Sequence, residues 1–113
     1  MEKDSKVYLE HILKAATEIA DFINGFTEED FLRDRKTQLA IIKNIEIMGE
    51  ATKKISSHIR TTNPNIPWSE MAAMRDKLMH SYADVNYKTV WEVSMNEIPE
   101  VKTAIEKLLQ GLN

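Results

Sequence analysis

The chain has 113 residues and a net charge of −3 at pH 7, with 42% hydrophobic and 29% charged residues. This balance is typical of one globular domain and argues against disorder. The lack of cysteine excludes a disulfide scaffold, a thiolate nucleophile and Cys-ligated zinc. Without a signal stretch or a long apolar run, we expect a cytoplasmic protein with no membrane partner. The acidic balance argues against a broad phosphate-binding surface but allows a small local anion site.

Apolar residues at three- and four-residue steps predict helices along the chain, beginning with one over about 6–24 that Gly25 ends. Thr27 is expected to cap a short second helix. A long third helix is predicted over about 34–60, and Gly49 within it is expected to let another helix approach closely. The buried stripe predicted for this helix consists of Leu39, Ile42, Ile45, Met48, Ala51, Thr52 and Ile55.

The two prolines in 61–67 prevent continuous helix there, and Pro67 suits the first turn of a helix that runs from about Trp68 to His80 or Tyr82. Asp84 is expected to cap a last helical region that reaches Gly111, with a kink or restart at Pro99. No window shows sustained two-residue alternation. The prediction is a single all-α domain over 1–113, a compact up-and-down bundle of four main helices plus a short one.

Arg75, His80 and Tyr82 gather at the end of the helix that follows Pro67. On a straight helix Arg75 and Tyr82 lie within about 20° of one face, whereas Arg75 and His80 lie about 140° apart. Three things can bring this arginine and histidine together: the reach of the arginine side chain, unwinding near His80, or a second copy of the motif in a symmetric dimer.

The chemistry open to such a group is RNA cleavage. Histidine can accept or donate a proton near neutrality, and arginine offers a fixed fork of donors to phosphate oxygens. In a dimer, two histidines can divide the acid and base roles. Tyr82 can bind a phosphate or ribose, or stack on a base.

Structural interpretations of the same residues stay open, because a helix with one arginine and one histidine is usually structural. His80 can cap helix-terminal carbonyls, and Tyr82 can be a half-buried core aromatic. Arg75 can pair with Glu46 or Glu50, which lie four apart on one face and can also form a carboxylate pair or face a neighbouring subunit.

The remaining candidates are weaker. Asp76 and Lys77 are expected to lie on a solvated helix face, and His11 and His58 lie on separate helices without the spacing of metal ligands, so no metal site is predicted. The interrupted basic cluster of Arg33, Arg35 and Lys36 is interpreted as a solvated helix start that can also form a rim for RNA or an acidic partner. Core packing is the interpretation for Trp68, Met71, Leu78 and Met79.

The string from Arg75 to Tyr82, Arg-Asp-Lys-Leu-Met-His-Ser-Tyr, resembles the Arg-x4-His-x-Tyr pattern of HepT-like proteins of the HEPN superfamily. The resemblance covers about residues 8–108. Its other landmarks, in order, are Asp34-Arg35-Lys36-Thr37-Gln38, Glu46-Ile47-Met48-Gly49-Glu50, Ile66-Pro67-Trp68 and Val90-Trp91.

This resemblance implies a helical homodimer whose two motifs lie near a shared cleft. It implies a metal-independent endoribonuclease without a cofactor, the toxin of a prokaryotic type VII-like toxin–antitoxin pair, in which Arg75 stabilises phosphate charge and His80 transfers a proton. The partner it implies is MntA, a minimal nucleotidyltransferase antitoxin that silences the toxin by moving AMP from ATP onto the motif tyrosine, here Tyr82. Candidates for a supporting role or for RNA contact are Glu46, Glu50, Asp76 and Lys77.

A second hypothesis is a non-catalytic HEPN module that binds a nucleotidyltransferase partner or its nucleotide. The acidic balance and the lack of a broad basic patch motivate it. In that case Arg75 contacts phosphate and no RNA is cut.

Overall fold

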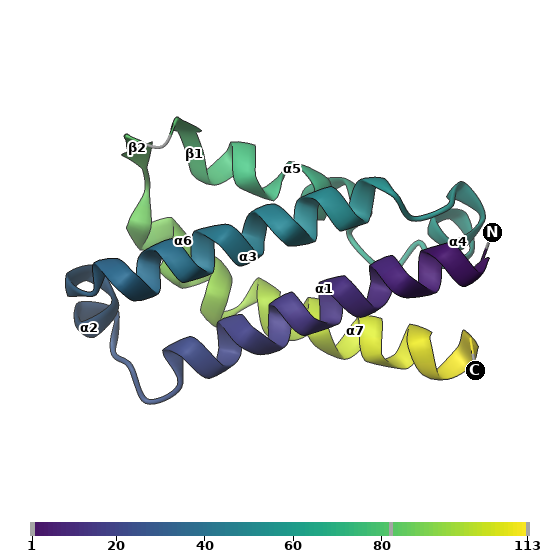
Figure 1. The fold of residues 1–113 in the computed structure, drawn as a ribbon, viewed down its shortest axis with the longest axis horizontal. Helices are drawn as coiled ribbons and strands as arrows, with labels where there is room; N and C mark the ends of the chain where they lie inside the picture. Colours follow the sequence, from purple (N-terminus) through teal and green to yellow (C-terminus); the bar gives the residue numbers. More distant parts are fainter. Residues whose placement is uncertain (1, 82, 113) are drawn as a thin grey trace.

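The computed structural model describes residues 2–81 and 83–112, and nearly all of them are helical. The helices pack side by side, with α3 between α1 and α5 and with α7 against α1 (Figure 1). This arrangement confirms the predicted all-α bundle. The elements are α1 (Glu2–Ile23), α2 (Glu28–Arg33), α3 (Arg35–Lys53), α4 (Ser57–Thr62), α5 (Trp68–Leu78), β1 (Met79–Ser81), β2 (Asp84–Val85), α6 (Tyr87–Met95) and α7 (Glu97–Leu112).

Local capping explains where the first helices begin and end. Gly25 has a φ of +82°, the left-handed conformation that favours glycine after a helix. Thr27 caps α2, as the sequence predicted, and the Asp30 side chain accepts from the Thr27 backbone in return, which completes a capping box. Asp34 then caps α3 by accepting a hydrogen bond from the backbone N–H of Thr37 at 3.0 Å.

The prediction of one helix over 34–60 was wrong, because α3 ends at Lys53 and a separate helix, α4, begins at Ser57. The Ser56 hydroxyl accepts a hydrogen bond from the backbone N–H of Ile59, so α4 has its own N-cap. Ile55 and Ile59 are both buried despite the break. The apolar pattern therefore identified Ile55 as a core residue but carried no information about the break in the helix before it.

The buried face of α3 is also rotated from the predicted stripe. Leu39 is 52% exposed, while the neighbouring Gln38 is buried. The Gln38 side-chain amide donates to the carbonyl oxygens of Phe31 and Leu32 at 3.0 and 3.2 Å, where α2 ends. Burial of this polar side chain is possible because its donors satisfy helix-terminal carbonyls.

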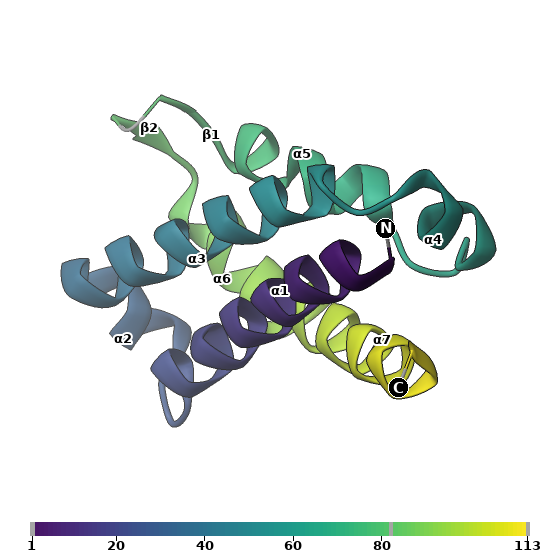
Figure 2. The ribbon, with the colours of Figure 1, turned by 45° about the vertical axis from the view of Figure 1, so that its right-hand side comes forward.

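The prediction that the helix after Pro67 reaches His80 was wrong as well. It ends at Leu78, and Met79 has extended backbone angles. In the antiparallel β1–β2 pair, Met79 lies opposite Val85 and Ser81 opposite Asp84. The hairpin extends from the bundle at the end away from the two chain termini (Figures 1 and 2).

Asp84 does not cap the next helix, because it lies in β2. Asn86 caps α6 instead, and its side chain accepts from the Thr89 backbone at 3.1 Å. The restart near Pro99 is confirmed: α6 ends at Met95, and Pro99 lies in the first turn of α7, where a missing N–H costs no helical hydrogen bond. Gly111 does not end α7, which continues to Leu112.

One cluster of buried hydrophobic residues joins the helices of the bundle. The rings of Phe31 and Trp91 join α2 to α6, with centroids 5.6 Å apart. Trp68, Met71, Leu78 and Met79 are all buried, so their interpretation as core residues is confirmed. The largest fully buried side chains are Phe31, Leu9, Ile12, Ile19, Ile41, Ile45, Met48, Ile59, Met71, Leu78, Ile98 and Ile105.

Candidate active site

Gly49 brings α5 close to α3 beside the candidate site. A Cβ atom at Gly49 would lie 3.4 Å from the backbone oxygen of Ala72 and 3.6 Å from that of Met71. The expectation that this glycine allows a second helix to approach is therefore confirmed. The close contact places Glu46, one turn earlier on α3, within reach of Arg75 on the last turns of α5.

Arg75 is held by two carboxylates. Its Nε donates to Glu46 Oε2 at 2.9 Å, and its Nη1 lies 3.4 Å from Asp76 Oδ1. The hydrogen bond to Glu46 holds the pKa of the Arg75 guanidinium above its ordinary value, which keeps it cationic. Because the Arg75 side chain is 41% exposed, solvent screens this pair, and its effect is on orientation more than on stability.

Anchoring through Nε has a chemical consequence for Arg75. The planar guanidinium keeps its two Nη groups for another acceptor, apart from the long contact with Asp76. A phosphate matches the fork of parallel donors that remains. Glu46 thus orients Arg75, as one of the open sequence interpretations proposed, while Glu50 pairs with Lys53.

Arg75 lies on an open groove of about 540 Å³ between α1, α3 and the end of α5. Its lining is rich in both signs of charge, which suits a polar ligand better than an apolar one. The lining residues are Tyr8, His11, Lys43, Glu46, Ile47, Glu50, Ala51, Lys53, Lys54, Arg75 and Asp76.

His80 does not line this groove with Arg75. It lies on β1, where Met79 is buried and both His80 and Ser81 are exposed, and the register of the β1–β2 pair is irregular between Met79 and Ser81. The angle expected between Arg75 and His80 on one straight helix no longer applies, because the helix has already ended. Both residues are described by the structure, and no hydrogen bond or ion pair joins them.

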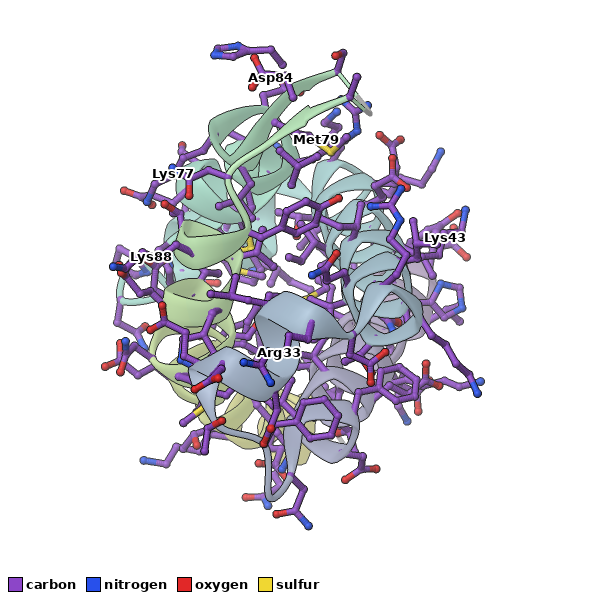
Figure 3. All side chains as sticks on the ribbon, turned by 90° about the vertical axis from the view of Figure 1, so that its left-hand side faces the viewer. Arg33, Lys43, Lys77, Met79, Asp84 and Lys88 are labelled. Atoms are coloured by element: carbon purple, nitrogen blue, oxygen red, sulfur yellow. The ribbon has the colours of Figure 1, made fainter. Side chains whose placement is uncertain are left out.

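The other predicted site residues do not gather at one site. Lys77 pairs with Glu97 of α7, Nζ to Oε1 at 3.7 Å, and Figure 3 shows it at the opposite edge of the molecule from Lys43. Asp76 is exposed beside Arg75, and Tyr82 lies outside the described residues. In the basic cluster, Arg33 pairs with Glu29, and Arg35 donates to the Tyr87 hydroxyl at 2.6 Å.

Sequence reasoning missed most of the groove. His11 was considered only as a metal ligand, and Tyr8, Lys43 and Lys54 were not considered as site residues. A signal for them exists, because residues 43, 47, 50 and 54 follow helical steps beside the buried face of α3. What the sequence could not show is that the corresponding positions of α1, including His11, face the same groove.

The described residues contain neither a metal-binding cluster nor a membrane-spanning helix. Over 2–81 and 83–112, no group of three or more His, Asp or Glu side chains is placed to hold a metal ion. Within the same residues, no helix combines the length and the apolar character that crossing a bilayer requires.

Comparison with known proteins identifies the family. The family model for Ribonuclease HepT-like proteins matches residues 12–108. A protein of Thermococcus cleftensis named "Probable ribonuclease HepT" is 44% identical over 96% of this chain and 98% of its own length. One of Methanocaldococcus jannaschii named "Putative RNase MJ0127" is 37% identical over 98% of this chain and 92% of its own. No solved structure gives a significant match. The chain belongs to the HepT-like ribonuclease family.

Proposed function

We propose that this protein is a metal-independent endoribonuclease in which Arg75 and His80 perform the chemistry. The observation that supports it most is the anchoring of Arg75, whose Nε is held by Glu46 at the edge of an open groove lined by charged residues. The remaining guanidinium donors can stabilise the charge that builds on a phosphate during cleavage.

The reaction needs one proton acceptor and one proton donor. A base removes the proton from a ribose 2′-hydroxyl, and the oxygen attacks the adjacent phosphorus. The bond from phosphorus to the 5′-oxygen breaks, and that oxygen takes up a proton from an acid. His80 is the candidate for both steps. It is exposed on the hairpin, and within the described residues no hydrogen bond or ion pair occupies its imidazole.

A homodimer provides the simplest way to complete the site. One chain keeps His80 outside the groove that holds Arg75. Two copies related by a two-fold axis bring two arginines and two histidines to a shared cleft, where the histidines divide the acid and base roles. We therefore assign the active form to a dimer.

The proposed cellular role is that of a cytoplasmic toxin paired with an MntA-like nucleotidyltransferase antitoxin. Transfer of AMP from ATP to the Tyr82 hydroxyl would add a phosphodiester with one negative charge next to the motif. That charge can bind Arg75 and repel an RNA backbone. Residues 80, 81, 83 and 84 around Tyr82 are exposed, as access by a modifying enzyme requires.

The direct test is incubation of purified protein with total RNA in EDTA, beside Arg75→Ala and His80→Ala variants. The proposal predicts cleavage by the wild type and its loss in both variants, each with an unchanged melting temperature. Full cleavage by His80→Ala would contradict the assigned role of His80. Intact mass measured before the assay shows whether the starting protein carries AMP. No cleavage by verified unmodified protein would instead favour the non-catalytic partner-binding module.

A further inference from the structure

The groove beside Arg75 continues along the surface between α1 and α3. A second depression, of about 250 Å³, is lined by His11, Lys14, Ala15, Glu18, Asn44 and Ile47. His11 and Ile47 line both depressions. The two therefore form one path, which we call the α1–α3 track, from Tyr8 and Lys54 at one end, past Arg75, to Lys14 at the other.

Some cations of the track are ion-paired and others are not. Among the described residues, Lys14 and Lys43 have no hydrogen-bond or ion-pair partner, whereas Lys53 pairs with Glu50. Unpaired ammonium groups next to a hollow remain available to an anionic ligand.

Two aromatic rings, those of Tyr8 and His11, line the track. The rings of Tyr8 and His11 meet edge to face, with centroids 5.7 Å apart. The Nζ of Lys54 lies over the Tyr8 ring, 5.9 Å from its centroid, so the ring helps to position this cation. Ile47, 38% exposed, adds an apolar surface between the two depressions.

We propose that the α1–α3 track binds a single strand of RNA and leads it past Arg75. Lys14, Lys43 and Lys54 contact phosphates along this strand, and the exposed His11 ring and Ile47 contact a base or ribose. This inference rests on the proposed ribonuclease function and adds to it the path of the substrate, with binding residues outside the Arg75–His80 motif.

The chemistry of the track favours a single strand over a duplex. Glu18, Glu46 and Glu50 lie among the cations, so positive charge follows a narrow line and does not cover a face. A duplex needs phosphate contacts from a broad surface, which a chain of net charge −3 does not offer. A single strand exposes its bases to rings and apolar groups, and its backbone can follow a narrow groove.

The test measures binding of a fluorescent single-stranded 2′-O-methyl oligonucleotide, which lacks the reactive hydroxyl and stays intact. The variants are Lys43→Ala and Lys54→Ala, with Lys43→Arg as the conservative change. Lys88→Ala is the matched control, because Lys88 is exposed on α6 and lies at the edge of the molecule opposite Lys43 (Figure 3). Each affinity is measured at several salt concentrations.

We expect Lys43→Ala and Lys54→Ala each to weaken binding several-fold and to lower the salt slope by about 0.7 for each lost phosphate contact. Lys43→Arg and Lys88→Ala should bind as the wild type does, and single-stranded competitor should displace the probe better than duplex of equal length. Equal affinity of all the variants, or equal competition by duplex, would overturn the inference. Since the probe is not cut, the result is independent of cleavage: loss of binding in variants of a protein that cuts no RNA would support the track and contradict the proposed activity.

Discussion

Glu46 and Arg75 are 29 residues apart in sequence, yet Glu46 Oε2 accepts a hydrogen bond from Arg75 Nε at 2.9 Å. The contact depends on the close approach of α5 to α3 at Gly49. It makes the carboxylate a positioning group for the arginine that the proposed chemistry uses. The packing of α5 against α3 at Gly49 thereby affects how Arg75 is oriented in the candidate site.

Replacing Glu46 should therefore affect turnover more than RNA binding. In Glu46→Ala the arginine keeps its charge but loses its orientation, and we expect kcat to fall about tenfold or more with a smaller change in KM. Glu46→Gln keeps an acceptor oxygen and should retain more activity. Steady-state kinetics on one RNA substrate measures both. An Ala variant with unchanged kcat would show that Glu46 does not position Arg75 for catalysis.

Two substitutions at Gly49 should distinguish the effect of helix propensity on stability from the effect of the spacing between α3 and α5. Gly49→Ala places a methyl group at ordinary contact distance from the backbone of α5 and gains about 1 kcal/mol of helix propensity, so thermal stability should rise. Gly49→Leu has no such space and should lower both the melting temperature and RNA cleavage, because α5 must move away from Glu46. Thermal melts and cleavage rates of the two variants measure this, and a Leu variant as stable and active as the wild type would contradict it.

The rotated face of α3 can be tested with two adjacent residues. Gln38→Leu removes the donors to two carbonyls at the end of α2 and should cost about 1–3 kcal/mol, although it makes the buried face more apolar. Leu39→Gln changes an exposed side chain and should stay within about 0.5 kcal/mol of the wild type. Urea unfolding gives the free energy of unfolding of both variants. A larger loss of stability in Leu39→Gln than in Gln38→Leu would favour the buried stripe predicted from the sequence.

The N-cap hydrogen bond of Asp34 should make the stability of the fold depend on pH. The backbone hydrogen bond from Thr37, which the carboxylate accepts at the start of α3, lowers the pKa of Asp34 below its ordinary value of 3.8. A carboxyl whose pKa is lower in the folded state stabilises the fold above pH 3.8 and loses that effect as pH falls through the folded value.

An Asp34→Asn variant keeps a cap oxygen but does not titrate. The wild type should therefore melt higher than the variant near neutrality, and the difference should shrink as pH falls below 3.8. Melting temperatures of the pair across that range measure it. A difference that is constant with pH would contradict the cap as the source.

The sequence predicted the parts of the molecule that follow local rules. The cap at Thr27, the stop at Gly25 and the close approach at Gly49 each depend on a few neighbouring residues or on the lack of a side chain, and all three were confirmed. The family, too, could be recognised from the motif and the order of its landmarks.

The errors arose where contacts between neighbouring elements determine the structure. Gln38 is buried because carbonyls at the end of α2 need donors, which periodicity does not reveal. The hairpin at Met79–Val85 pairs two segments too short to show alternation. Of the candidate site, Arg75 and its partner Glu46 were among the predicted residues, whereas the opposite wall of the groove on α1 depends on how the helices pack.

We propose that two chains complete one site in which both His80 side chains are required, because one chain does not place His80 in the groove of Arg75. Wild-type and His80→Ala protein, unfolded together and refolded in equal amounts at constant total concentration, test it through RNA cleavage in EDTA. If both histidines of a dimer are required, activity falls to about one quarter of the wild-type value, since random pairing leaves that fraction of dimers intact. Activity of one half or more would contradict the claim, because each wild-type chain would then cut RNA without a second histidine.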